Sequence, residues 1–134
     1  MQTFSWPIRI YYEDTDAGGV VYYANYLKFF ERARTEMLRA IGYEQDALRT
    51  TANVIFVVRS VQLDYLSPAR FNDLLEVSTT IAEVKRTQIF FDQLMTRDAV
   101  TLCRTKIGIA CLNATTMRPT AIPQPLLEQL QNEN

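Results

Sequence analysis

The stretch from Tyr11 to Tyr43, YYEDTDAGGVVYYANYLKFFERARTEMLRAIGY, places a carboxylate, a double-glycine turn and an amphipathic segment next to one another. Asp16 comes first, and the pair Gly18-Gly19 follows two residues later. Glycine can adopt positive φ and lets other groups approach the backbone closely. The pattern therefore predicts a tight functional turn before a helix, with Asp16 at the start of that turn.

The second half of the stretch has the periodicity of an amphipathic α-helix. Apolar residues recur at spacings of three and four, at Tyr26, Phe29, Phe30, Ala33, Met37, Ala40 and Ile41. Gly42 follows, where helix C-termini favour a left-handed residue. We predict a helix from Asn25 to Ile41, with Asp16 near its N-terminus. Backbone N–H groups there lack intrahelical acceptors and can hold a developing oxyanion, so the arrangement indicates acyl chemistry.

Length and composition favour one globular domain spanning residues 1–134. A chain of 134 residues with 48% hydrophobic and 22% charged residues can bury a hydrophobic core. The net charge of −1, without a basic run, argues against a nucleic-acid partner. The N-terminus has no basic leader, and no run approaches about 18 apolar residues, so we expect no transmembrane segment and a cytoplasmic location.

The sequence contains no histidine and two cysteines, and this narrows the available chemistry. Cys103 and Cys111 lie in one predicted strand about 27 Å apart, too far to bridge each other. Zinc sites of the usual Cys/His kind and Ser-His-Asp or Cys-His relays are excluded. We expect catalysis by carboxylate, tyrosine, lysine or backbone groups, with no metal and no organic cofactor.

Five segments have the alternation and β-branched content of strands, at Phe4 to Tyr12, Val54 to Leu66, Leu74 to Val84, Thr87 to Thr96 and Val100 to Leu112. The first strand is expected to keep Tyr12 in its apolar phase. In the second, the expected shared face carries Ile55, Val57, Val61, Leu63 and Tyr65.

The last three strands are separated by short polar breaks at Lys85-Arg86 and Arg97-Asp98, which predict consecutive hairpins. Residues 44–53 are expected to form a loop or short helical turn, and the C-terminal tail one docked turn with frayed ends. The order of elements predicts an α+β fold in which an antiparallel sheet wraps the apolar stripe of the helix.

Three stretches carry a close resemblance to a known family: EDTDAGGVVYYANYLKFFERARTEML, FVVRSVQLDYLSPAR and RPTAIP. They resemble the Tol-Pal-associated branch of the 4-hydroxybenzoyl-CoA thioesterase-like, hotdog-fold acyl-CoA thioesterases. The resemblance covers almost the whole chain. It implies a five-stranded antiparallel sheet wrapped around one long central helix. It also implies a homodimer or homotetramer with active sites at the dimer interface.

Residue roles follow from the same resemblance. The second Asp of the family's D-x-D motif falls on Asp16, which is expected to act as nucleophile or as general base toward water. The backbone N–H that polarises the thioester carbonyl falls near Tyr23, where many members of the branch have histidine. The leaving group is a thiolate, whose conjugate thiol has a pKa of about 8.5. It can therefore depart at neutral pH without a proton donor, so the reaction does not need that histidine.

The remaining candidates have weaker signals. Tyr12 and Tyr23 are candidates for the acyl pocket, and Gly18 and Gly19 for contact with the thioester. Basic residues in related enzymes bind the phosphates of coenzyme A, which makes Lys85, Arg86 and Arg118 candidates here. Asp14 is interpreted as structural, and Glu31 is an outside candidate because some hotdog branches use a helix glutamate. Each candidate also has a simpler, structural interpretation. Asp16 would be a turn residue, the tyrosines would pack in the core or at an interface, and the charged residues would be solvated.

The preferred hypothesis is hydrolysis of an acyl-CoA, or of an acyl-carrier-protein thioester, to free acid and thiol. The runner-up is a non-catalytic scaffold that binds acyl thioesters or acyl carrier protein near the cell envelope machinery, peripheral to the inner membrane. A hotdog dehydratase is a third hypothesis, disfavoured because that chemistry ordinarily uses histidine as base.

Overall fold

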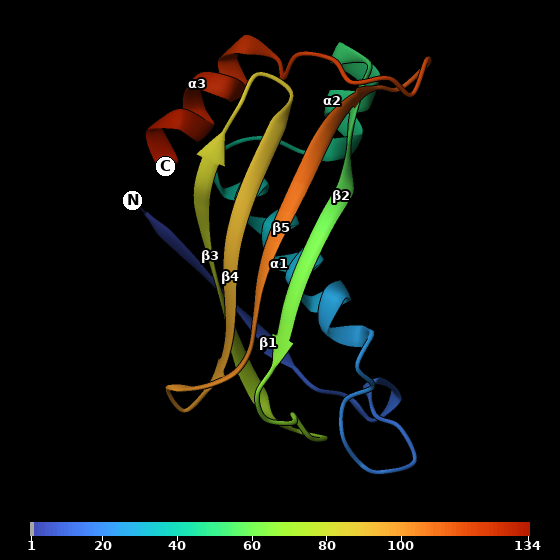
Figure 1. Ribbon diagram of the computed structural model, residues 1–134, viewed down its shortest axis with the longest axis vertical. Helices are drawn as coiled ribbons and strands as arrows, with labels where there is room; N and C mark the ends of the chain where they lie inside the picture. The colour runs from blue at the N-terminus through green and yellow to red at the C-terminus, as the bar shows by residue number, and fades with distance from the viewer. Residues whose placement is uncertain (1) are drawn as a thin grey trace.

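The computed structural model describes residues 2–134, and its strands form one antiparallel sheet in the order β1-β3-β4-β5-β2. The strands are β1 (Thr3–Arg9), β2 (Val54–Tyr65), β3 (Leu74–Val84), β4 (Gln88–Arg97) and β5 (Val100–Asn113). The long helix α1 (Asn25–Ala40) lies along one face of the sheet (Figure 1). The predicted α+β architecture, with one central helix and five antiparallel strands, is confirmed.

The buried face of α1 differs in part from the predicted one, because Ala40 is exposed and Ile41 is only partly buried. Tyr26, Phe29, Phe30, Ala33 and Met37 are buried as expected, and Arg34 and Leu38 are buried with them. The predicted end at Ile41 differs from the observed end by one residue. Gly42 has a φ of 98°, as expected for a residue that ends a helix in the left-handed region.

The two hairpins that join β3, β4 and β5 are confirmed. Asp98 and Ala99 form the tight turn between β4 and β5, with φ values of 51° and 65°. Positive φ at both central residues is typical of the turns that match the twist of paired strands. Alternate residues of β3 and β4 are buried, and so are most residues of β5, so these hairpins contribute much of the core.

The edge strand β2 contains a register shift that its alternating sequence pattern does not predict. Its register with β5 shifts between Val58 and Ser60, as in a β-bulge. The extra residue reverses the alternation, so the prediction that Ile55 and Val57 share a face with Val61 is wrong. Val58 and Val61 instead pair with residues of β5 whose side chains are buried beneath α1.

Gly108 in β5 makes room for this bulge. A Cβ at Gly108 would overlap the Ser60 hydroxyl and lie 3.2 Å from the Phe90 ring. On either side of the bulge the inner face of β2 is incompletely covered, and Val58 and Val61 remain 50% and 43% exposed. The free edge and the exposed apolar face of β2 therefore lie together on one side of the molecule.

Three segments differ from their predicted form. Residues 44–53 contain a helix of two turns, α2 (Gln45–Ala52), and the C-terminal tail forms the ten-residue helix α3 (Gln124–Glu133). Leu126 and Leu130 of α3 are fully buried, which explains why the tail folds further than one turn. β1 ends at Arg9. Tyr12 therefore lies outside β1, and its predicted place in the strand is wrong.

A buried polar network ties α1 to the sheet. Arg34 Nη1 donates to Gln93 Oε1 at 3.0 Å, while Gln93 Nε2 donates to Phe30 O at 3.0 Å and to Thr79 Oγ1 at 2.9 Å. Burial lowers the pKa of Arg34 to about 10, although the charge of Glu31 opposes the shift. The guanidinium stays charged at neutral pH, and it fixes the rotation of α1 over β4.

Both cysteines are free and buried, in agreement with their predicted separation along one strand. Within residues 2–134, no helix has the length and apolar character required to cross a membrane.

Candidate active site

Asp16 lies at the start of a closed loop that precedes α1. Asp16 N donates to Val20 O at 2.9 Å, and Gly19 N donates to Asp16 O at 3.0 Å. Gly19 has a φ of 80°, which confirms the positive φ expected at this position. Gly18 N donates to Asp16 Oδ1 at 2.8 Å, and a Cβ on Gly18 would approach that oxygen to 3.2 Å. The loop thus holds the exposed carboxylate by one oxygen and leaves the other accessible to solvent.

Asp14, the neighbouring carboxylate, closes a different turn. Its Oδ2 accepts a hydrogen bond from Tyr11 N at 2.8 Å, within the 3-10 turn Tyr12–Asp14. Its backbone oxygen accepts from Tyr22 N at 3.0 Å and from Asn25 Nδ2 at 2.9 Å. Asp14 therefore connects the chain before the loop with the chain after it, and its carboxylate is already engaged.

The start of α1 has unsatisfied backbone donors. Ala24 occupies the N-cap position in a helical conformation, and its side chain makes no capping hydrogen bond. The side chain of Asn25 is directed back to Asp14, although asparagine is a good capping residue elsewhere. Among residues 2–134, neither Tyr23 N–H nor Ala24 N–H has a hydrogen-bond acceptor. These two donors are available to a ligand.

Tyr22 and Tyr23 lie in the segment between the Asp16 loop and the start of α1. The neighbouring Tyr23 side chain raises the pKa of Tyr22, and burial and the negative charge of Asp16 raise that pKa further. The rings of Tyr22 and Tyr23 lie 4.9 Å apart between centroids. Asp16, Tyr22 and Tyr23 are all exposed, and Tyr22 N donates to Asp14 O at 3.0 Å, which connects the segment before α1 to the start of the Asp16 loop. The catalytic roles of Asp16 and Tyr23 stay predictions.

Two further tyrosines lie behind this surface. Tyr26 is buried, and its hydroxyl accepts a hydrogen bond from Ala69 N at 3.0 Å. Tyr65, the last residue of β2, donates its hydroxyl hydrogen to Tyr23 O at 2.7 Å. Sequence reasoning assigned Tyr65 only to a strand face, because no local spacing relates it to a residue 42 positions earlier.

Tyr12 is 79% exposed and packs edge-on against Phe71, with ring centroids 5.9 Å apart. It belongs to the same end of the molecule as Asp16, and its exposure leaves the ring accessible to a bound molecule.

The basic candidates lie at the other end of the chain's fold. Lys85 and Arg86 are in the β3–β4 turn, opposite the loop that contains Asp16 (Figure 1). Lys85 Nζ lies 5.4 Å from the centroid of the Phe90 ring. Arg86 O accepts from Ile122 N at 2.9 Å, so this turn lies next to the tail that contains Arg118. One copy of the chain therefore does not bring these basic residues to Asp16.

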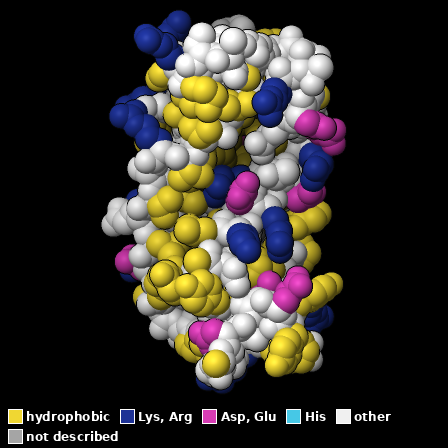
Figure 2. Space-filling model, turned by 90° about the vertical axis from the view of Figure 1, so that its right-hand side faces the viewer, with side chains coloured by type: hydrophobic (Ala, Val, Ile, Leu, Met, Phe, Trp, Pro, Cys, Tyr) yellow, Lys and Arg dark blue, Asp and Glu magenta, His cyan; other side chains and the backbone are white. Residues whose placement is uncertain are grey.

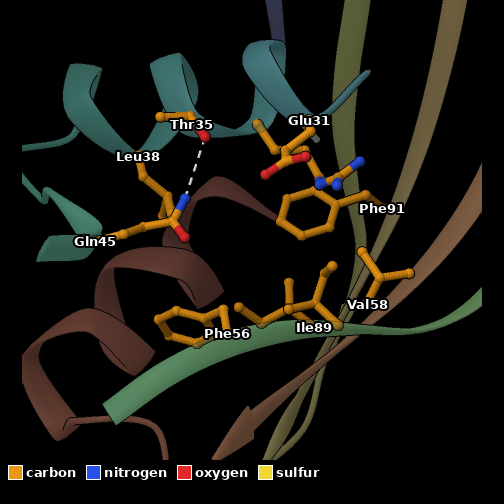
Figure 3. A pocket seen from close by; sticks show the side chains of 10 residues that line it. Glu31, Thr35, Leu38, Gln45, Phe56, Val58, Ile89 and Phe91 are labelled. Atoms are coloured by element: carbon orange, nitrogen blue, oxygen red, sulfur yellow. Dashed lines mark hydrogen bonds between the residues drawn. The ribbon is translucent and has the colours of Figure 1, made fainter. Parts of the chain in front are cut away.

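A cavity of about 140 Å³ opens between α1 and the inner face of the sheet near β2 (Figure 3). Apolar side chains line its sheet side, including Phe56, Val58 and Ile89, and Glu31 and Arg34 line its helix side. Figure 2 shows this side of the molecule, where hydrophobic side chains surround a central group of basic and acidic ones. Glu31, the outside candidate, thus faces a cavity separate from the loop of Asp16.

No group of His, Cys, Asp and Glu residues within 2–134 is arranged to hold a metal ion.

Comparisons with known proteins identify the family of this chain. Residues 11–130 match the family model of the thioesterase-like superfamily. Acyl-CoA thioesterase YbgC of Haemophilus influenzae is 46% identical over 121 residues, covering 90% of this chain and 89% of that protein. Acyl-CoA thioester hydrolase YbgC of Escherichia coli O6:H1 is 42% identical over 129 residues, covering 96% of each. The crystal structure of a probable thioesterase from Bartonella henselae superposes with a TM-score of 0.87 at 33% identity, covering 91% of this chain and 100% of that one.

Proposed function

This chain belongs to the thioesterase-like superfamily, and from that membership we propose that it hydrolyses acyl-CoA thioesters to the free acid and CoA. The resemblance to hotdog-fold acyl-CoA thioesterases described from its sequence is confirmed. The observation that carries the proposal is the exposed carboxylate of Asp16, held by Gly18 next to the uncapped start of α1. No metal or organic cofactor is required by this chemistry.

The proposed reaction uses Asp16 and the backbone at the helix start. Asp16 accepts a proton from water as the water oxygen forms a bond with the carbonyl carbon, or it attacks that carbon itself and forms an anhydride that water then cleaves. Tyr23 N–H donates to the carbonyl oxygen and stabilises the negative charge that develops on it. The C–S bond breaks and CoA leaves as a thiolate, which at a pKa near 8.5 needs no acid at roughly neutral pH.

Substrate contacts are assigned in two groups. Tyr12, Gly18 and Gly19 contact the acyl-thioester end of the substrate, since they surround Asp16 on an exposed surface. Lys85, Arg86 and Arg118 bind the phosphates of coenzyme A. Because these basic residues lie at the opposite end of the fold from Asp16, we assign them to the active site of a partner subunit.

This assignment requires a homodimer, and the family resemblance extends the proposal to a homotetramer. The free edge of β2 and the exposed side chains of Val58 and Val61 support the dimer, since apolar inner-face positions on an edge strand favour burial against a second copy. Light scattering on the active protein tests the proposal, and a fully active monomer would contradict it.

Release of thiol from a panel of acyl-CoAs, from acetyl to lauroyl and including benzoyl, tests the activity. Burial raises the pKa of Cys103 to about 12 and that of Cys111 to about 11, so both thiols stay protonated and react slowly with the thiol reagent. The assay background is therefore low. We expect turnover of at least one panel member, and the absence of turnover on every chain length would refute the hydrolase.

A second candidate is a non-catalytic scaffold for acyl thioesters or acyl carrier protein near the envelope machinery, in the cytoplasm at the inner membrane. The presence of Tyr23 where many relatives have histidine favours it. Titration of wild type and of Asp16→Asn with acyl carrier protein distinguishes the two. Binding that is equal in both proteins, without hydrolysis by wild type, would support the scaffold over the enzyme.

A further inference from the structure

We propose that Tyr65 is a positioning residue for the active site, because its hydroxyl holds the Tyr23 carbonyl and so aims the free Ala24 N–H at the start of α1. The inference rests on the proposed function and adds to it a residue from a distant strand.

The contact itself is short and joins two separate parts of the fold. Tyr65 Oη donates to Tyr23 O at 2.7 Å, which is the usual distance of a strong O–H···O hydrogen bond. Tyr65 is the last residue of β2, where it pairs with Cys103 of β5. Tyr23 lies in the irregular segment before α1, outside the five-stranded sheet. The hydroxyl therefore connects the helix start to the five-stranded sheet.

Peptide geometry explains how a bond to an oxygen controls an N–H donor. The Tyr23 carbonyl and the Ala24 N–H belong to the same planar peptide group, so a bond that fixes the oxygen also fixes the direction of the N–H. A hydrogen bond to the carbonyl polarises the peptide group and strengthens its N–H as a donor. Tyr23 N–H belongs to the preceding peptide plane, whose oxygen, Tyr22 O, accepts a hydrogen bond from Asn25 N at 2.8 Å. The donor that Tyr65 orients directly is therefore Ala24 N–H, next to a Tyr23 N–H that is held separately. Both donors lack an acceptor among residues 2–134.

The aromatic ring of Tyr65 is also connected to the loop of Asp16, through Tyr26 and Ala69. Its centroid lies 5.3 Å from that of Tyr26, whose hydroxyl accepts from Ala69 N. Ala69 O in turn accepts from Val21 N at 2.8 Å, at the end of the loop that carries Asp16. The carboxylate and the helix-start donors are thus held by one set of contacts at the end of β2. Burial raises the pKa of Tyr65, so its hydroxyl remains a donor at mildly alkaline pH.

The experiment compares Tyr65→Phe with a matched loss of a hydroxyl elsewhere, Tyr43→Phe. Tyr43 packs against the core beyond the other end of α1, and its hydroxyl has no hydrogen-bond partner within residues 2–134. We expect Tyr65→Phe to lower kcat by roughly tenfold, less than the loss of a whole oxyanion donor, with KM changed less than about twofold. Tyr43→Phe should leave both constants unchanged.

A spectroscopic readout separates positioning from general loosening of the fold. The best acyl-CoA of the panel, labelled with ¹³C at its carbonyl, is bound to Asp16→Asn with and without Tyr65→Phe. With Tyr65 present, the carbonyl stretching frequency should lie below that of free substrate; with Tyr65→Phe it should return toward the free value at saturating protein.

The outcomes are distinguishable. If wild type hydrolyses the substrate while Tyr65→Phe matches it in kcat and in carbonyl frequency, this inference is wrong and the proposed function stands. If Tyr65→Phe loses kcat with no change in carbonyl frequency, the residue is structural and the inference is also wrong. Absence of hydrolysis by wild type refutes the proposed function and this inference together.

Discussion

The two ends of α1 are built in opposite ways. At the C-terminal end, Tyr43 N donates to Leu38 O at 2.8 Å and Gly42 N donates to Arg39 O at 3.0 Å. These are the two bonds of a Schellman motif, which satisfies carbonyls that a helix end leaves free. At the N-terminal end, no side chain caps the helix, and among residues 2–134 the N–H groups of Tyr23 and Ala24 find no acceptor.

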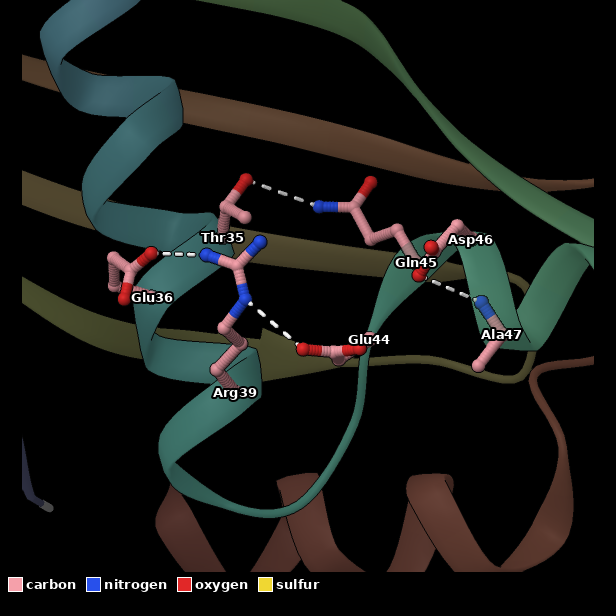
Figure 4. Close-up of polar contacts among 7 residues, drawn as sticks. All are labelled: Thr35, Glu36, Arg39, Glu44, Gln45, Asp46 and Ala47. Atoms are coloured by element: carbon pink, nitrogen blue, oxygen red, sulfur yellow. Dashed lines mark hydrogen bonds and ion pairs between the residues drawn. The ribbon is translucent and has the colours of Figure 1, made fainter.

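Charged and polar side chains reinforce the closed end. Arg39 forms ion pairs with Glu36 in its own helix and with Glu44 just beyond it (Figure 4). A cation in the last turn also interacts favourably with the helix dipole. Gln45 Nε2 donates to Thr35 Oγ1 at 3.2 Å, which links α2 to α1 at the same place.

Under the proposed mechanism, the C-terminal end of α1 serves stability and the N-terminal end serves chemistry. Uncapped donors lower the stability of a helix, since a capping side chain is worth about 1 kcal/mol. In the proposed mechanism, the free donors at the N-terminal end of α1 stabilise a developing oxyanion next to Asp16. Changes at the open end should therefore affect activity, and changes at the closed end should affect stability.

The largest effect is expected from Asp16→Asn. The amide oxygen can still accept from Gly18 N, so the loop should keep its shape. The amide cannot accept a proton or attack the thioester, and kcat/KM should fall on the order of 10²-fold or more. Steady-state kinetics and thermal melting measure the two properties. Asp14→Asn is the matched control and should retain activity, because its amide oxygen can still accept from Tyr11 N; equal losses in both variants would contradict the assignment.

Gly19→Ala and Gly42→Ala compare the two ends directly. Both glycines have positive φ, and a Cβ at either position meets nothing within 4 Å, so both substitutions introduce the same kind of backbone strain. We expect each to cost about 1–2 kcal/mol of stability in denaturant titrations. Only Gly19→Ala should also lower kcat/KM, by roughly tenfold, because it displaces Asp16. An equal loss of activity in Gly42→Ala would show that the ends are not independent.

Substitutions of Tyr23 test whether the open end acts through backbone or side chain. Tyr23→Phe retains the N–H and the carbonyl that Tyr65 holds, so kcat/KM should change less than about threefold. Tyr23→His introduces the residue expected here from the family resemblance and should change kcat/KM less than about tenfold, since thiolate departure needs no acid. Loss of turnover in a folded Tyr23→Phe, together with an active Asp16→Asn, would mean that the tyrosine hydroxyl carries the chemistry.

The smallest effect is expected from Arg39→Gln at the closed end. Its ion pairs are solvent-exposed, and such pairs contribute little to stability because water and salt screen them. The midpoint of denaturant unfolding should barely change, and kcat/KM should stay as in wild type. A tenfold loss of activity in this variant would place functional groups at the end assigned here to stability.

Local features of the fold and site were predictable from the sequence. The start of α1 at Asn25, the left-handed Gly42 and the positive φ of Gly19 follow from periodicity and from the freedom of glycine. The hairpins follow from polar breaks between β-branched segments. The place of Asp16 beside the helix start follows from its position nine residues before Asn25.

Other features depend on contacts between residues far apart in the chain, and local patterns do not contain them. The faces of Ile55 and Val57 were wrongly predicted because the β2 bulge is set by its register with β5. The tail folds into α3 because Leu126 and Leu130 find a buried surface, which their own short apolar pattern does not reveal. Arg34 was not among the residues predicted for the buried face of the helix, and it is buried because Gln93 offers an acceptor from β4.

The sequence by itself determined which segments form helix, strand and tight turn, because backbone preference and side-chain periodicity act within a few residues. The tertiary structure alone decided that Tyr65 reaches Tyr23 O and that Lys85 lies at the opposite end of the fold from Asp16. The physical reason is that strand order and register set these positions, and both are chosen by the burial of side chains contributed by several strands and α1 together.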